Sequence, residues 1–460
     1  MTPAAGTGSL RLRWLTAAIV LLLVGGAQLG LVAGAGTDIP FQDQWDSEGR
    51  GLYPAWVDGS LHAGDLFSPH NEHRILWTRL LDLALFSADG QWDPLVQLVV
   101  GAGLHALLAA GLVLLLTRGM LAVPAWILAG TITLLSLPLA AWHNALWGFQ
   151  SQVYFVLLFS LGALAVLAPP GSPPLRIAAG CALALAAMFA MGAGLLVPFV
   201  LLGGIAWRGL GGKLDGRRAI PVVILAAVAW MLRADVPAHE ALRAGSVADF
   251  CGAFLRLLAW PYPEQPWVGL VLNLPLLLLA GLRVRRRRAV VVAEDFVWLA
   301  AGWVVATLAV TAWSRGGSAE FAAGVPSRYV DFVVLLPLLN AWAVVVLACG
   351  SAGRVRLLGG VWLVFLLLGW WGAVLLAWQN ILRPRLRERD APVRLVQAFQ
   401  MSGNPEVFAG QPRLLVPHPN PETVRAVLHD PRLQGRLPPS LQPDRPSGPL
   451  SRATRDLLGR

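Results

Sequence analysis

The stretch WLTAAIVLLLVGGAQLGLV, residues 14–32, decides the fold class of this chain. It is long and apolar enough to cross the hydrocarbon core of a bilayer as an α-helix. Similar runs recur along the 460 residues, which are 56% hydrophobic and 13% charged, with a mean hydropathy of +0.61. Soluble domains are about a quarter charged. We therefore expect an all-α, polytopic membrane protein.

Ten further apolar runs bring the predicted number of transmembrane helices to eleven. They lie near 95–117, 120–140, 151–168, 175–190, 192–207, 219–233, 266–282, 290–313, 330–349 and 357–379. Arg11 and Arg13 precede the first run and small residues follow it at 33–35, so a cleaved signal peptide is the alternative. We expect a retained span, because the polar segment that follows needs an anchor.

Basic residues in alternate loops predict the orientation. Arg118, Arg176, the 208–218 group, the 283–288 run and Arg354 with Arg356 all fall on the side of the N-terminus. The positive-inside rule makes that side the cytoplasm of a bacterial inner membrane, with the C-terminus in the periplasm. This distribution also explains the net charge of +10 without a nucleic-acid partner.

The segment 175–207 is the weak point of this topology. We interpret it as two short spans joined at Met191-Gly192. A single span would move every later loop to the other side and turn the arginines of 283–288 outward, against the charge rule.

The first outer loop, residues 36–94, is the one long acidic stretch of the sequence. It holds ten carboxylates and three arginines in a chain that is basic as a whole. We expect the reactive site here, on a membrane domain of residues 1–379. Helical periodicity over 72–86, and apolar residues in 51–61, predict interfacial helices in this loop. The polar, proline-rich tail, 380–460, is expected to be a small periplasmic appendage or partly disordered, with short helices at 391–400 and 421–428.

Asp43 and Asp46, in the motif DQWD, are the candidate catalytic residues. A carboxylate just outside the bilayer can accept a proton from an acceptor hydroxyl, or bind a divalent cation such as Mg²⁺ or Mn²⁺. Their spacing allows both to face one pocket if the segment is helical or turned. The alternative is a solvated acidic loop.

The motif HNEHR at 70–74 is the next candidate. If a helix starts early, His70, His73 and Arg74 share one face, and with Glu72 they suit phosphate or pyrophosphate binding. A metal pair of the two histidines and a plain helix cap are the alternatives.

Two further outer segments carry candidate substrate-binding residues. The segment 142–152 combines tryptophans with Asn144, Gln150 and Gln152, side chains that suit a sugar ring. Tryptophans of the aromatic belt are the alternative there. In the loop 314–329, Arg315 and the motif Ser327-Arg328-Tyr329 suit an anionic lipid head, although Asp331 could pair with Arg328 instead.

Taken together, these residues resemble the C-type (GT-C) superfamily of membrane glycosyltransferases. The likeness covers the number of spans, the acidic loop after the first span and the outer tail, whereas DQWD matches the family motif in place and character only. DQWD, HNEHR, GFQSQ and SRY together are also similar to a group of uncharacterised bacterial membrane proteins near this superfamily. The resemblance implies that Asp43 or Asp46 is the general base or a metal-linked carboxylate, and that Arg328 contacts a carrier phosphate.

The expected function is transfer of a sugar from a polyprenyl-phosphate donor to a lipid-linked or cell-surface glycan at the periplasmic face of the bilayer. A transporter or flippase for polyprenyl-linked glycans is the alternative. His105 in the second span, and the prolines in several spans, favour that alternative, whereas the lack of charge in the span centres and of repeated halves favours the enzyme.

Overall fold

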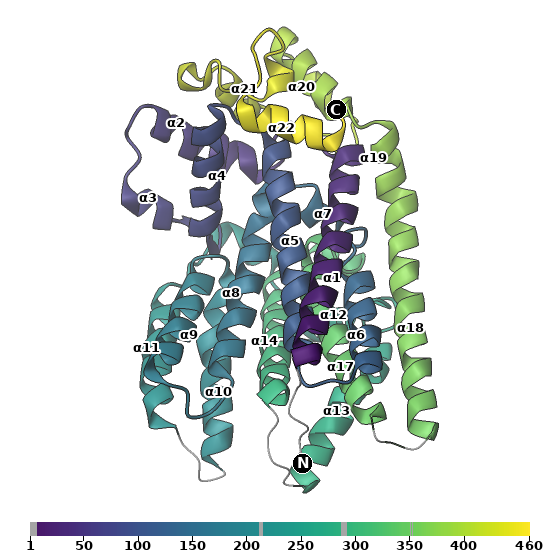
Figure 1. Cartoon of the computed structure of the whole chain (residues 1–460). Coiled ribbons are helices and arrows are strands. Elements are labelled where there is room, and N and C mark those ends of the chain that lie inside the picture. Colours follow the sequence, from purple (N-terminus) through teal and green to yellow (C-terminus); the bar gives the residue numbers. More distant parts are fainter. Residues whose placement is uncertain (1–6, 211–214, 287–291, 350, 352) are drawn as a thin grey trace.

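The computed structural model describes residues 7–210, 215–286, 292–349, 351 and 353–460. Those residues form an almost wholly helical molecule with a long bundle and a cap of short helices at one end (Figure 1). The predicted arginine run at 283–288 lies partly outside the described residues.

Seven helical stretches of the described chain are long and apolar enough to cross a membrane. They coincide largely with α1 (Thr7–Ala35), α5 (Pro94–Leu116), α8 (Ser151–Leu167), α10 (Val197–Gly209), α14 (Val292–Arg315), α17 (Leu335–Ala348) and α18 (Gly353–Ala377). Three shorter apolar helices accompany them, α6 (Ala122–Leu135), α9 (Pro174–Met188) and α13 (Val268–Arg286), together with α11 (Gly216–Met231). A helix therefore lies at each predicted apolar run, and the number of eleven spans stays a prediction.

The chain reverses direction between α9 and α10. At one end of the bundle, Arg208 and Arg218 both donate hydrogen bonds to the carbonyl of Ala168, which follows α8. At the other end, the Gly192 N–H donates to His73 of the first loop. Residues 175–207 therefore form a helical hairpin that turns at 189–192, as the sequence predicts, and not a single helix.

Basic and acidic side chains meet at the end of the bundle away from the cap. Asp295, at the start of α14, forms ion pairs with Arg208 at 2.6 Å and with Arg283 at 2.9 Å. These three residues come from α10, α13 and α14, so the predicted gathering of basic loops at one end is confirmed for them.

The first loop folds into short elements at the cap end. They are η1 (Trp45–Leu52), α2 (Tyr53–Val57), α3 (Ala63–Phe67), the paired strands β1 (Pro69–His70) and β2 (His73–Arg74), and α4 (Leu76–Asp89). The predicted helix over 72–86 starts too early, because Asn71 has a φ of +51° and turns the chain into a hairpin that ends at Arg74. The helix begins only at Leu76.

Of the two segments predicted to lie at the membrane interface, only α4 is oriented as expected. In α4, Leu80 is exposed whereas Arg79 and Asp82 are buried, which is the orientation expected of a helix with its apolar side at an interface. In the segment 51–61, by contrast, Leu52 and Tyr53 are buried inside the cap. In that segment, therefore, only the exposed Trp56 is placed as an interfacial residue would be.

The tail packs on the first loop and forms the rest of the cap. It contains η6 (Trp378–Leu382), α19 (Arg383–Arg387), α20 (Ala391–Ser402), η7 (Pro405–Phe408), α21 (Pro421–Leu428), η8 (Pro431–Leu433), η9 (Pro439–Leu441) and α22 (Pro449–Leu458). Two of these, α20 and α21, coincide with the predicted helices at 391–400 and 421–428. Loop and tail share an apolar core of their own, in which Trp45, Trp92 and Phe399 are buried.

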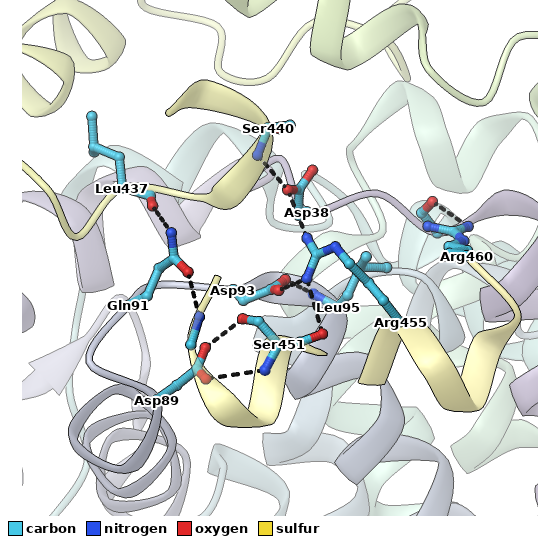
Figure 2. Close-up of polar contacts among 12 residues, drawn as sticks. Asp38, Asp89, Gln91, Asp93, Leu95, Leu437, Ser440, Ser451, Arg455 and Arg460 are labelled. Atoms are coloured by element: carbon cyan, nitrogen blue, oxygen red, sulfur yellow. Dashed lines mark hydrogen bonds and ion pairs between the residues drawn. The ribbon is translucent and has the colours of Figure 1, made fainter. Parts of the chain in front are cut away.

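Ion pairs fasten α22 to the ends of α1 and α5 (Figure 2). Arg455 bridges two buried carboxylates, Asp93 at 2.6 Å and Asp38 at 3.1 Å. Asp89 accepts hydrogen bonds from the Leu450 and Ser451 amides. The tail therefore holds the start and the end of the first loop in place.

Candidate functional site

A large cavity lies between the cap and the bundle, with a volume of about 1530 Å³. Segments far apart in the sequence line it: the first loop, α7 (Trp142–Ala145) with η2 (Gly148–Gln150), the connection η4 (Pro237–Leu242), α14, α15 (Ala319–Ala322) with η5 (Ser327–Tyr329), and α18. Nine of the predicted site residues line it: Asp43, His70, Glu72, His73, Gln150, Gln152, Arg315, Arg328 and Tyr329.

Asp43 is the carboxylate of the DQWD motif that reaches the cavity. Its Oδ2 lies 3.8 Å from His70 Nε2, and no other ion pair to Asp43 occurs among the described residues. The preceding residue, Gln42, has a φ of +49°, which is uncommon for a residue other than glycine. The N–H of Gln42 donates to the Pro417 carbonyl at 2.7 Å, so the tail fixes the backbone that carries Asp43.

Asp46 turns away from the cavity. It lies in the first turn of η1 and accepts a hydrogen bond from His418 Nε2 of the tail at 2.8 Å. The prediction that both aspartates could face one pocket is therefore wrong. Asp43 begins this helical segment on the cavity side, whereas Asp46, three residues later in η1, lies against the tail.

Glu72 contacts two side chains at the cavity wall, His239 and Arg315. Its Oε1 accepts from His239 Nδ1 at 2.5 Å and from Arg315 at 2.8 Å. Burial acts to raise the pKa of Glu72, but the His239 hydrogen bond and the charge of Arg315 outweigh it and hold this pKa at about 2. Glu72 is thus a fixed anion that links the β-hairpin to η4 and α14.

The neighbouring His73 is a neutral group. Its Nδ1 accepts from the Gly192 N–H at 3.3 Å, and burial lowers its pKa to about 4, although Glu72 opposes the shift. Gly192 has to be small, since a Cβ there would lie 2.9 Å from this nitrogen. His70 and His73 are opposite each other in the two-stranded hairpin, so the prediction of one helical face shared with Arg74 is wrong.

Arg74 has a structural role in the described chain. It donates to the Leu232 carbonyl at 3.3 Å and to the Phe67 carbonyl at 2.6 Å, and it is not among the residues that line the cavity. The β-hairpin places it on the side of α3 and the end of α11.

Arg328 lies on the opposite segment, η5, beside Tyr329. It donates to Glu320, which also lies 3.4 Å from Arg413 of the tail. Two arginines thus share one carboxylate on the cavity wall, which leaves an excess of positive charge there. Burial, followed by the charges of Arg328 and Arg385, lowers the pKa of the nearby His143 to about 3, although Glu320 opposes the shift.

Asn144 positions this arginine segment and does not line the cavity. Its Nδ2 donates to the Arg328 carbonyl at 3.1 Å and to Asp331 Oδ2 at 2.8 Å. Asp331 therefore pairs with Asn144, and with His105 at 3.9 Å, and not with Arg328 as the sequence allowed. His105 also bonds Gln28 of α1 at 2.6 Å, so it is a hydrogen-bonded residue of the interior.

The segment 142–152 forms an aromatic wall of the cavity. Five rings follow one another, Trp142, His143, Trp147, Phe149 and His70, with centroids 5.0 to 5.7 Å apart. Gln150 and Gln152, at the start of α8, line the same cavity, and both are buried.

The remaining wall is apolar and belongs to the bundle. On α18 it consists of Leu368, Gly369, Gly372, Ala373, Leu376 and Ala377, and on α14 it includes Val310. The cavity therefore combines a polar wall under the cap with an apolar wall among the membrane-type helices. The α18 contribution was missed at the sequence level, although the spacing of its small residues was a signal.

A second polar cluster, unnoticed in the sequence, lies inside the cap. Glu48 and Asp82 are buried, and Gln97 Nε2 donates to both at 2.9 Å. Burial raises the pKa of Glu48 to about 7, and burial followed by the charge of Glu48 raises the pKa of Asp82. No local pattern in the sequence marks this burial, because the hydrogen-bond partners come from separate segments.

The two aspartates do not come together as ligands of a metal ion. Asp43 faces His70 and Asp46 faces His418. Within the described ranges, no group of three His, Cys, Asp or Glu side chains is arranged to hold an ion. The three cysteines, Cys181, Cys251 and Cys349, are free thiols.

Comparison of the chain with models of protein families, with curated proteins and with solved structures gives no match.

Proposed function

We propose that this protein is a membrane glycosyltransferase of the C type, which moves a sugar from a polyprenyl-phosphate donor to a lipid-linked or cell-surface glycan. On the charge pattern, the reaction takes place at the periplasmic side of a bacterial inner membrane. The observation that carries the proposal is the composition of the cavity: the carboxylate of Asp43 without an arginine partner, two arginines that share the single carboxylate of Glu320, and an apolar helical wall.

An amphipathic donor fits such a cavity. The α18 wall offers apolar surface for an isoprenoid chain, and the Arg328–Glu320–Arg413 group offers the net positive charge for a single phosphate. Arginine suits phosphate because its planar fork of donors matches the phosphate oxygens. Lipid and phosphate can thus be held by different walls of one cavity.

The reaction needs one proton acceptor and stabilisation of one leaving group. Asp43 accepts the proton of the acceptor hydroxyl while the acceptor oxygen bonds the anomeric carbon of the sugar. The bond from that carbon to the phosphate oxygen breaks, and its electron pair leaves with the phosphate. Arg328 and Arg413 stabilise the charge that develops there, which is a large contribution in group-transfer enzymes.

A transfer assay tests the proposal. The purified protein in lipid vesicles is supplied with a polyprenyl-phosphate sugar labelled in the sugar, together with glycolipids from the cell envelope. The expected result is a new labelled glycolipid whose glycosidic bond survives mild acid that cleaves the donor. Absence of any such bond with every envelope fraction rejects the proposal.

A transporter of polyprenyl-linked glycans is the second candidate, and one observation favours it. His105 of α5 and Asp331 at the start of the α17 stretch form a buried pair within apolar helices, and such pairs often mark ion or substrate pathways. Sealed vesicles separate the two candidates. Movement of labelled lipid between leaflets without a new glycosidic bond supports the transporter.

A further inference from the structure

The side-chain amide of Gln44 closes the turn that carries Asp43. Gln44 is buried, and its Oε1 accepts a hydrogen bond from the Phe41 N–H at 3.1 Å. The backbone N–H of Gln44 donates to the Phe41 carbonyl at 3.2 Å, so two hydrogen bonds join the ends of this turn. The Nε2 of Gln44 donates to Gln97 Oε1 of α5 at 2.7 Å. The turn is therefore tied to a long helix of the bundle, with Asp43 inside it.

The buried acids of the cap determine which way the two amides point. The indole N–H of Trp92 can only donate, and Glu48 Oε2 accepts it at 2.8 Å. The Nε2 of Gln97 donates to the same oxygen and to Asp82 Oδ1, both at 2.9 Å. Because the nitrogen of Gln97 faces the acids, its oxygen has to face Gln44. Gln44 must then present its nitrogen to Gln97 and its own oxygen to the backbone of the turn.

Gly148 leaves the space in which the two amides meet. A Cβ at Gly148 would lie 2.5 Å from Gln97 Oε1 and 3.2 Å from Gln44 Nε2. The preceding residue, Trp147, donates its indole N–H to the Phe41 carbonyl at 2.8 Å. The aromatic wall of the cavity thus packs on the amide contact and on the turn at once, and a side chain at 148 would push the amides apart.

The acids that orient the amides are unfavourable for the stability of the fold. Burial raises the pKa of Glu48 to about 7, and burial followed by the charge of Glu48 raises the pKa of Asp82. Glu48 Oε1 is also buried without a hydrogen-bond partner among the described residues. Groups with such strongly shifted pKa values gather at functional sites. Neither acid lines the cavity, so a functional effect has to pass through the residues that they contact.

We propose that Gln44, oriented by Gln97 and Glu48, is a positioning residue that holds the carboxylate of Asp43 toward the cavity. This inference rests on the proposed function, which assigns Asp43 as the proton acceptor. It gives the acidic cluster inside the cap a role in the reaction, although none of its residues reaches the substrate. Placement of this kind matters because a shift of about 1 Å in a reacting group can lower a rate roughly a hundredfold.

Gln44→Glu tests the inference, because it keeps the shape of the side chain and makes its donor depend on pH. The protonated carboxyl group can donate to Gln97 Oε1 and accept from the Phe41 N–H, as the amide does. The ionised group has no proton to donate and faces the Gln97 oxygen with an oxygen of its own. The kcat of the variant, relative to wild type at the same pH, should be within a few-fold at about pH 5. It should be about tenfold to a hundredfold lower at about pH 8.

The charged groups around Gln44 act in the same direction. Glu48 Oε2 lies 3.4 Å from Gln44 Nε2, and it would repel an ionised carboxylate at this position. Asp82 and Tyr53, which contact Gln97, add no cation. Arg385 of α19 lines a small pocket together with Gln44, and its charge would draw the carboxylate away from Gln97. Repulsion and attraction therefore both separate the ionised side chain from α5.

Two measurements accompany the rates. Affinity for an isoprenyl phosphate should not change, because the donor contacts proposed at Arg328 and α18 do not include Gln44. Hydrogen exchange of the backbone over residues 41–45 should be faster than in wild type at about pH 8 and similar at about pH 5, since the turn loses its tie only when the carboxyl group is ionised.

Gln91→Glu is the matched control for a new buried carboxyl group. Gln91 is a buried amide of the same loop that donates to the Leu437 carbonyl and accepts from the Gly448 N–H, and it does not line the cavity. This variant should lose stability as the pH rises, with kcat and the exchange over 41–45 close to those of wild type at both pH values.

Gly148→Ala separates position from charge. It pushes the amides of Gln97 and Gln44 apart without a new ionisable group. The kcat should therefore fall relative to wild type by a similar factor at both pH values, with faster exchange over residues 41–45. A wild-type kcat in this variant would show that the charge introduced in Gln44→Glu acts on Asp43 through its field, and it would overturn the positioning role.

The outcomes distinguish this inference from the proposed function. If wild type transfers sugar but the relative kcat of Gln44→Glu does not change with pH, the positioning role is rejected and the proposed function stands. The same holds if Gln91→Glu lowers kcat as much, or if kcat falls without faster exchange over residues 41–45. If wild type transfers no sugar while the exchange changes as expected, Gln44 fixes the turn, but the proposed function fails and the role in catalysis fails with it.

Discussion

The Oδ2 atom of Asp43 lies 3.8 Å from Nε2 of His70, on the wall of the large cavity. The other carboxylates of this wall that form ion pairs, Glu72 and Glu320, each contact an arginine at short range. Among the described residues, Asp43 has no such partner. A carboxylate next to a histidine and open to a cavity can accept a proton, whereas a carboxylate bound to arginine is a poor base.

Asp43→Asn should lower the rate of sugar transfer by about 10²-fold or more, since general-base catalysis contributes on this scale. Asp46→Asn, the matched control from the same motif, should retain a rate within a few-fold of the wild type, because Asp46 contacts His418 and not the cavity. The measurement is the initial rate in lipid vesicles at equal protein. A wild-type rate for the Asp43 variant removes the assignment.

Arg328→Lys should weaken binding of the donor by about tenfold, because lysine keeps the charge but loses the planar fork that matches phosphate. The control is Arg432→Lys, which alters an arginine of the cap that pairs with Asp430 and Asp58. Titration of an isoprenyl phosphate into the protein in nanodiscs gives both affinities. Equal affinities in the two variants contradict a phosphate contact at Arg328.

Gly372→Trp should fill the apolar wall of the cavity. A Cβ at Gly372 meets nothing within 4 Å, and Gly372 lines the cavity. Gly360→Trp on the same helix is the control, because its Cβ also meets nothing but it is not part of the wall. Binding of a long isoprenyl phosphate should fall in the first variant alone. If both variants bind the long isoprenyl phosphate as tightly as the wild type does, the isoprenoid chain does not bind at this wall.

Glu48 should make the stability of the fold depend on pH. Its pKa is about 7 in the folded protein and 4.5 for the free group, so the folded state favours the protonated form. This contribution to the free energy of unfolding is fully present below pH 4.5 and is lost as the pH rises to about 7. Glu48→Gln should therefore be the more stable protein at pH 8, with a melting temperature roughly a few degrees higher.

The difference in melting temperature between variant and wild type, followed from pH 4.5 to pH 8, isolates the effect of Glu48. The lowered pKa of His73 acts in the opposite sense, since its stabilising contribution is lost as the pH falls from 6.5 to about 4. That effect is present in both proteins and cancels. A difference that does not change with pH would show that Glu48 is ionised throughout.

Arg455→Met should destabilise the cap by about 3–5 kcal/mol, because two buried carboxylates, Asp38 and Asp93, lose their cation. Burial, followed by the charge of Asp38, raises the pKa of Asp93 to about 6 even against Arg455. The loss should therefore be smaller at pH 5, where Asp93 can take up a proton. Thermal unfolding and trypsin release of the tail measure it, with Arg452→Met of the same helix as control.

Sequence periodicity predicted the helices of the bundle and the turn at 189–192, because apolar runs of span length have few alternatives. The positions of the basic loops also predicted that Asp43, His70 and Arg328 lie at one end of the molecule, where the cavity brings them together. This second prediction succeeded because the charge of each loop can be read from the local sequence and does not depend on packing.

The same reasoning failed for residues whose environment is made by distant segments. Glu48 and Asp82 look like solvated acids of a polar loop, but Trp92, Gln97 and Tyr53 enclose them. Asp46 resembles Asp43 in sequence, and only the tail residue His418 distinguishes the two. These contacts join separate segments, which lie 372 residues apart for Asp46 and His418, and they leave no local pattern.

The bridge from Arg455 to Asp38 and Asp93 bears on how the protein matures in the cell. Because translation proceeds from the N-terminus, every apolar helix of the bundle is synthesised before α22. The segment that carries Asp43 therefore lacks the contacts of Arg455 until residues 449–458 have been translated. Competence of the cavity would thus be a late event in biogenesis, and nascent chains arrested before α22 would reach the membrane with an unfinished cap.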